Sequence, residues 1–388
     1  MITEIPLPAE LHRSAALLEE RLKVLRVTTR KVPISEWQSL PEPFHDFVPS
    51  WIPTLFAHHS ILNAVLDCPR EEGQRYYSLF LWGPQRYAEN YADLGIEEGS
   101  IYKEVFDSGL APFAGAEHEA FWITSISDGS HSPIYLFEIT WFDYFFASSR
   151  MELLLACVGI GGHYNASHES KTSAIGYPEK GQPLPGTEPP SKLRGETGLP
   201  LELESSARSL EERLKFLQVP ARKVPISEWN TVPGNVRALV PEWIPALLAN
   251  YGLLGAVLGC LAWGEPFHLR LWEPAEYESQ HESANQGLKE LIHDKGLVPI
   301  GSSDNGIYWV TSLDGGPLSS ISVFSSTPDE HKNGGKLEFA SSRMELLMAS
   351  MGISKRSFST FGKSLEPRSV MWYPETPGND MGRPLEKR

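Results

Sequence analysis

The chain has 388 residues, of which 41% are hydrophobic and 21% charged, and its formal net charge at pH 7 is −15. This composition is typical of a globular protein and excludes an intrinsically disordered chain. The acidic balance argues against nucleic acid and anionic lipid as partners, because both repel a negative surface. There is no run of 18 apolar residues and no secretory leader pattern, so we expect a cytoplasmic protein without membrane spans.

The first part of the chain predicts helices followed by strands. The pattern indicates, in order, a helix over 13–25, a short proline-led helix within 48–60, and strands over 61–68 and 76–83. The apolar residues of the first helix recur at helical spacing, whereas those of 76–83 alternate. We therefore expect the sheet to begin after the second helix.

The next part predicts a helix, a hairpin and a closing helix. In order, these are a helix over 101–109 that stops at a glycine, a strand over 120–126, an Asp-Gly turn, and a strand over 132–139. The box "FASSRMELL" then predicts a helix whose start is a capping box between Ser149 and Glu152. Helices, an antiparallel meander and a closing helix together predict an α+β fold.

The same order of elements occurs twice, because the sequence is duplicated. The octapeptide "RKVPISEW" stands at Arg30–Trp37 and at Arg222–Trp229, and "FASSRMELL" at Phe146–Leu154 and Phe339–Leu347. We predict two tandem domains, 1–190 and 191–388, each with a polar C-terminal arm. Large aromatic residues recur between the copies and are expected in the core: Trp37, Trp51, Trp82 and Trp122, with Trp229, Trp243, Trp272 and Trp309.

The sequence contains no convincing catalytic constellation. His58 and His59 are adjacent, whereas two metal ligands on a helix normally stand four residues apart, and the second copy has Asn250 and Tyr251 there. We therefore expect a solvent-exposed or half-buried histidine pair. We expect no catalytic residues, no metal and no cofactor, and predict that the chain is not an enzyme.

Four features in a fixed order resemble the SUKH superfamily of bacterial immunity proteins and fungal cell-wall regulators. They are an early helix with tryptophan and proline, the passages "LAPFAG" and "LVPIGS" before an aromatic strand, an Asp-Gly turn, and the "FASSRMELL" helix. The resemblance covers about 100 residues of each copy. It implies two SUKH-like domains, each an antiparallel sheet flanked by helices, and an immunity protein that neutralises a cognate polymorphic toxin by binding it.

Charge suggests where a toxin binds. Residues 1–190 carry 13 Lys and Arg against 25 Asp and Glu, a balance of −12, which leaves −3 for the second copy. Complementary charge accelerates capture of a basic protein such as a nuclease toxin. We expect partner contacts at Glu71, Glu72, Glu97, Glu98, Glu104, Asp107 and Trp141, the last because it has no counterpart in the second copy.

Two alternatives stay open. One is a non-enzymatic intracellular scaffold or regulatory protein with the same fold that bridges two partners. The other, ranked last, is an enzyme whose site forms between the two domains. Bound metal, or loss of activity when His58 and His59 are replaced, would favour it.

Overall fold

The computed structural model divides into two compact units of the same architecture. It describes residues 2–68, 77–93, 101–116, 120–138, 143–148, 150–160, 195–262, 265–283, 286–303, 307–325, 336–341 and 343–354. Unit 1 takes in the described residues of 2–23 and 27–160, and unit 2 those of 24–26 and 195–354. The predicted boundary between residues 190 and 191 lies outside these ranges.

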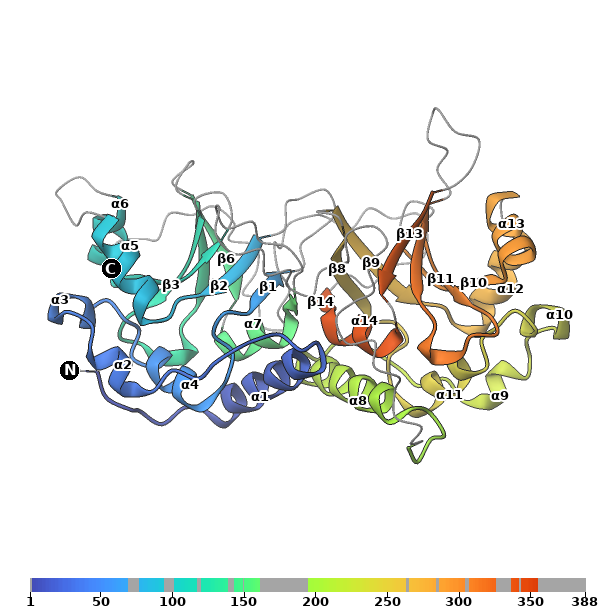
Figure 1. Cartoon of the computed structure of the whole chain (residues 1–388), viewed down its shortest axis with the longest axis horizontal. Helices are drawn as coiled ribbons and strands as arrows, with labels where there is room; N and C mark the ends of the chain where they lie inside the picture. Colours follow the sequence, from blue (N-terminus) through green and yellow to red (C-terminus); the bar gives the residue numbers. More distant parts are fainter. Residues whose placement is uncertain are drawn as a thin grey trace. The chain divides into compact units, whose positions relative to one another are not determined.

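Unit 1 begins with helices and continues with a sheet (Figure 1). Its elements are α1 (Ala9–Val24), α2 (Ile34–Gln38), α3 (Glu42–His45), α4 (Ile52–His58), β1 (Val65–Cys68), β2 (Tyr77–Leu81), α5 (Pro84–Asp93), α6 (Ile101–Asp107), β3 (Leu110–Ala116), β4 (Ala120–Ser125), β5 (Ile134–Glu138), β6 (Asp143–Ser148), α7 (Met151–Cys157) and β7 (Gly159–Ile160). A short 3-10 turn, Gly129–His131, joins β4 to β5.

Unit 2 repeats this order of elements (Figure 1). They are α8 (Leu201–Phe216), α9 (Ile226–Trp229), α10 (Gly234–Arg237), α11 (Trp243–Asn250), β8 (Val257–Ala262), β9 (Glu265–Leu271), α12 (Pro274–Ser283), α13 (Gln286–Lys295), β10 (Leu297–Ser303), β11 (Ile307–Ser312), β12 (Ile321–Ser325), β13 (Lys336–Ser341), α14 (Met344–Ser350) and β14 (Gly352–Ser354).

Each unit contains one antiparallel sheet whose seven described strands run almost in sequence order. The orders are β6-β5-β4-β3-β2-β1-β7 and β13-β12-β11-β10-β9-β8-β14. Only the last short strand departs from the meander, since β7 returns to pair with β1 and β14 with β8. A bulge follows the proline of β3 and of β10, where a ladder donor is missing. The predicted α+β fold, with antiparallel sheets flanked by helices, is confirmed.

The core is built from the residues that the two copies share. All eight recurrent tryptophans are buried, which confirms the prediction that they belong to the core. In the octapeptide, Trp37 stacks on Phe56 of α4 and contacts Tyr87 edge-on. The N–H of Val32 donates to the carbonyl of Phe56, so the octapeptide is tied to α4 by backbone as well as by side chain. Burying such aromatic groups is among the largest stabilising contributions available to a domain.

Two helix-end predictions have different outcomes. Gly109 and Gly296 follow α6 and α13 with φ of +74° and +60°, the left-handed conformation expected of a glycine that ends a helix. The capping box is wrong, because α7 begins at Met151 and its N-cap is Arg150, without a side-chain cap. Ser149 lies outside the described residues, and the residues just before it extend β6 instead of starting the helix.

Candidate functional site

Functional differences between the units are best sought where equivalent positions carry different side chains. The octapeptide itself is the reference, because its arginine and glutamate form the same exposed pair in both units. Arg30 Nη1 lies 2.9 Å from both carboxylate oxygens of Glu36. Arg222 Nη1 lies 3.2 and 3.1 Å from those of Glu228. This pair is common scaffold, and an exposed pair of this kind contributes at most about 1 kcal/mol.

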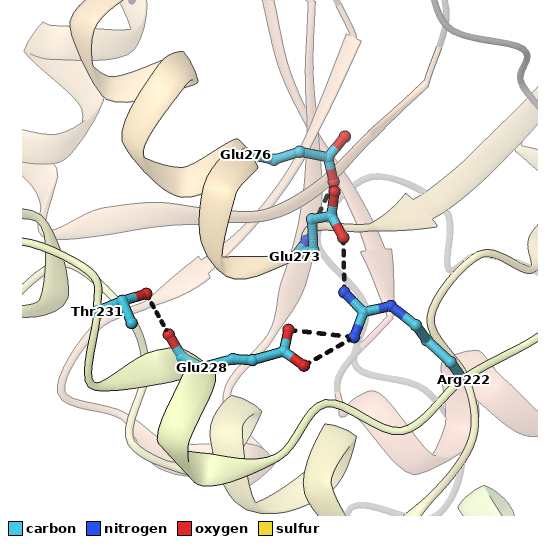
Figure 2. Close-up of polar contacts among 5 residues, drawn as sticks. All are labelled: Arg222, Glu228, Thr231, Glu273 and Glu276. Atoms are coloured by element: carbon cyan, nitrogen blue, oxygen red, sulfur yellow. Dashed lines mark hydrogen bonds and ion pairs between the residues drawn. The ribbon is translucent and has the colours of Figure 1, made fainter.

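Unit 2 adds a second carboxylate to this pair (Figure 2). Arg222 Nη2 donates to Glu273 Oε2 at 2.9 Å, so the guanidinium bridges two glutamates from different elements. The pKa of Arg222 is raised, chiefly by the hydrogen bond to Glu273 and further by Glu228. The equivalent of Glu273 in unit 1 is Gly83.

The start of α12 holds Glu273 in place. Glu276 Oε2 accepts a hydrogen bond from the backbone N–H of Glu273 at 3.0 Å, a contact of the capping-box type. The other oxygen of Glu276 is paired with Arg270. Sequence reasoning missed this cluster. Its visible sign is that "EPAE" in the second copy replaces "GPQR" in the first.

Four of these charged side chains, those of Arg222, Arg270, Glu273 and Glu276, line an open groove of about 430 Å³. Its apolar lining residues include Pro220, Ala221, Leu254 and Leu271. Among the lining residues, Arg222 and Arg270 balance the charges of Glu273 and Glu276. The groove therefore suits a neutral or mixed-charge polypeptide surface better than an isolated anion such as phosphate.

Unit 1 carries a histidine cluster that unit 2 lacks. His12 Nδ1 lies 3.0 Å from His59 Nε2, and the ring of His58 meets that of His12 edge-on at 5.4 Å. His59 Nδ1 is 3.5 Å from a carboxylate oxygen of Glu19, while His58 Nε2 is 2.7 Å from Glu4. These contacts join α1, α4 and the segment that precedes α1.

Burial affects the protonation of one member of this cluster, His59. Desolvation lowers the pKa of His59, the neighbouring His12 lowers it further, and Glu19 opposes both. His58 is exposed but His59 is buried, so the expectation of an exposed or half-buried pair was wrong for His59. Within the described ranges, no group of three or more His, Cys, Asp and Glu side chains is arranged to hold a metal ion.

Buried carboxylates occur in both units and serve the fold. Glu152 and Glu345 are each 1% exposed in the first turn of the closing helix, and desolvation raises the pKa of each. Arg150 Nε lies 3.1 Å from Glu152, and Arg343 Nε lies 2.6 Å from Glu345. A shifted pKa can mark a functional site. Here the same arginine–glutamate pair recurs in both units, which indicates a structural role.

Most of the predicted partner residues fall outside the part of the chain that the structure describes. Glu71, Glu72, Glu97, Glu98 and Trp141 lie outside the described residues. Glu104 stands in α6, but its side chain is not described. Asp107 is the exposed last residue of α6. The structure therefore places one of the seven side chains, and it places that side chain on the surface.

The end of α6 differs from its counterpart in unit 2. Asp107 is equivalent to Asp294, but the next residue is Ser108 in unit 1 and Lys295, the last residue of α13, in unit 2. The carboxyl end of a helix carries partial negative charge, so a lysine there is favourable and an aspartate is not. Unit 2 thus balances this end with an exposed cation, while unit 1 leaves it acidic.

Comparisons with known proteins add no relative. No family model, curated protein or solved structure matches this chain. Within the described residues, no helix has the length and apolar character needed to cross a membrane.

Proposed function

We propose that this chain is an immunity protein that binds and neutralises a basic toxin protein, without catalysis of its own. The order of four sequence features and the helix-flanked antiparallel sheet in each unit support a SUKH-like domain. The charged side chains of the described clusters pair with one another at the surface or at helix ends.

The observation that carries the proposal is the acidic end of α6. An exposed Asp107 at the carboxyl end of a helix costs stability, because it faces the negative end of the helix dipole. The duplicate shows that a lysine fits at the next position, since Lys295 occupies it. Unit 1 therefore keeps an acidic surface where the fold accepts a neutral one. A cationic partner benefits from that surface through faster association.

The first experiment isolates the partner and measures how charge affects its capture. The tagged protein is expressed in its own cells, the stoichiometric partner is identified, and the association rate is measured at low and physiological ionic strength. Charge reversal at Glu97, Glu98, Glu104 and Asp107 is expected to slow association by roughly 10-fold or more at low salt and to flatten its salt dependence. An unchanged rate and salt dependence would refute the acidic contact.

A matched pair of single variants separates binding from folding. Ser108→Lys gives unit 1 the lysine of unit 2, so it should stabilise α6 by about 0.3–1 kcal/mol while slowing capture of the toxin. Lys295→Ser makes the reverse exchange, and should destabilise α13 by a similar amount while leaving capture unchanged. If both variants change capture equally, or neither does, the contact does not lie at α6.

A further inference from the structure

The segment that precedes α1 is a structural part of unit 1. Residues 2–8 run in extended form past α2 and α4 to the start of α1 (Figure 1). The N–H of Ile5 donates to Thr54 Oγ1 at 3.0 Å, and Gln38 Nε2 donates to the carbonyl of Ile2 at 3.1 Å. Ile2 is buried and Ile5 is half-buried, so aliphatic side chains three residues apart face the protein.

The equivalent segment of unit 2 takes another path. Residues 195–200 form a turn in which Gly195 N–H donates to the carbonyl of Leu199 at 2.9 Å. Thr197 N–H donates to Glu204 Oε1 at 2.9 Å, and the Thr197 hydroxyl is bonded to the same oxygen. Gly198 has a φ of +80°, which a proline such as its counterpart Pro6 cannot adopt. The turn is thereby held against the first turn of α8.

A groove is open in unit 2 where this segment is missing. It encloses about 1300 Å³ and begins at the turn itself, since Thr197–Pro200 line it. Its walls are α10, α11 and the turn after β11, with Arg237, Trp243, Ala246 and Leu318 among the lining residues. Ala246 is the equivalent of Thr54, the residue that binds the segment in unit 1.

Exposure at equivalent positions supports the correspondence. Pro53 and Thr54 of α4 are buried, whereas Pro245 and Ala246 of α11 are only half-buried. The same holds in the turn after the equivalent strand, where Ser130 is buried in unit 1 and its equivalent Pro317 is half-buried. Ile34 is half-buried, while its equivalent Ile226 is 50% exposed, one of the two exposed large hydrophobic residues of the described chain.

We propose that this groove binds an extended polypeptide segment of a partner protein, in the way that unit 1 binds residues 2–5. Its volume exceeds the roughly 300–1,000 Å³ of ordinary small-molecule pockets, which favours a chain segment over a small ligand. Residues 2–5, which occupy the equivalent place in unit 1, indicate what kind of segment the groove of unit 2 would bind. It is an extended backbone with aliphatic side chains three residues apart. This proposal does not depend on the partner being a toxin.

The probe is a labelled peptide with the sequence of residues 2–8, ITEIPLP, added to the full chain. Saturable binding by fluorescence anisotropy is expected, with loss of binding when the peptide carries Ile2→Asp and Ile5→Asp. A photoreactive side chain at the position of Ile5 should cross-link to α11. Cross-linking to α4 would overturn the proposal, because the peptide would then be displacing the segment of unit 1.

Two variants of one half-exposed residue sharpen the test. Ala246→Thr supplies the hydroxyl that Thr54 offers in unit 1, and should tighten binding roughly 2- to 10-fold, the value of one added hydrogen bond. Ala246→Arg fills the groove, and should reduce affinity at least 10-fold while leaving the thermal unfolding of the chain unchanged. Full binding to the Ala246→Arg variant would refute the proposal. Self-association that this variant abolishes would also refute it, because the occupant would then be a second copy of the chain.

Discussion

The buried tryptophans provide a test of how much a buried hydrogen bond contributes to stability. Trp51 and Trp122 are both within 1% of full burial. The indole N–H of Trp122 donates to the carbonyl of Ser78 at 3.2 Å, whereas that of Trp51 has no hydrogen-bond partner among the described residues. The change Trp→Phe removes the same atoms at both positions. Their difference therefore measures the hydrogen bond.

The expected difference follows from the cost of burying polar groups. Trp122→Phe loses a net hydrogen bond of about 0.5–1.5 kcal/mol, in addition to the cavity term. Trp51→Phe removes the same number of atoms, but it relieves a desolvated N–H that costs about 1–3 kcal/mol. The free energy of unfolding should thus fall by about 1.5–4.5 kcal/mol more for Trp122→Phe than for Trp51→Phe.

Unit 2 contains an equivalent pair of tryptophans, so the same comparison can be made there. Trp309 donates to the carbonyl of His268 at 2.9 Å, and Trp243 is the counterpart of Trp51 without a partner among the described residues. Hydrogen exchange of peptides from β4 and β11 is the appropriate measurement, since a chain of two units need not unfold in one step. Equal costs for the two substitutions in both units would refute the assignment of the hydrogen bonds.

Two further predictions concern the sites that distinguish the units. Burial lowers the pKa of His59, so below its ordinary value of 6.5 the unfolded chain binds a proton that the folded chain resists. Unit 1 should therefore lose stability as the pH falls below 6.5, and His59→Tyr, the residue of unit 2 at this position, should lose less in hydrogen exchange; equal losses would contradict the assignment. Glu273→Gly gives unit 2 the glycine of unit 1 and should cost no more than about 1 kcal/mol in denaturant unfolding, with the cost shrinking at high salt because Arg222 is exposed. A large, salt-independent loss would show that the cluster is structural.

Much of the fold could be predicted because its elements carry strong local patterns. The spacing of apolar residues predicted α1, and a glycine with positive φ marks the end of α6. Helix α5 was missed, because its sequence is largely polar and its buried anchor is Tyr87, whose hydroxyl donates to the carbonyl of Pro112. Such a helix depends on tertiary contacts that no local pattern displays.

The candidate sites were harder to predict, because they depend on which distant residues meet. The sequence showed His58 beside His59 but not His12, which arrives from α1. The groove of unit 2 has one visible sign in the sequence, since Gly195 and Gly198 replace Thr3 and Pro6. Read alone, those glycines predict only a turn. Their consequence, a groove beside α11 that is open among the described residues, can be seen only in the fold.

The groove of unit 2 is kept open by more than one residue difference between the units. Glu204 takes the place of His12 and holds the turn through Thr197, so the segment is kept at α8. Ala246 lacks the hydroxyl group with which its equivalent, Thr54, accepts a hydrogen bond from the N-terminal segment of unit 1. Meanwhile the core tryptophans and the octapeptide are the same in both units, so the fold itself does not demand either arrangement. Duplication has thus left one unit with its groove filled by its own chain and the other with the same groove available to another polypeptide.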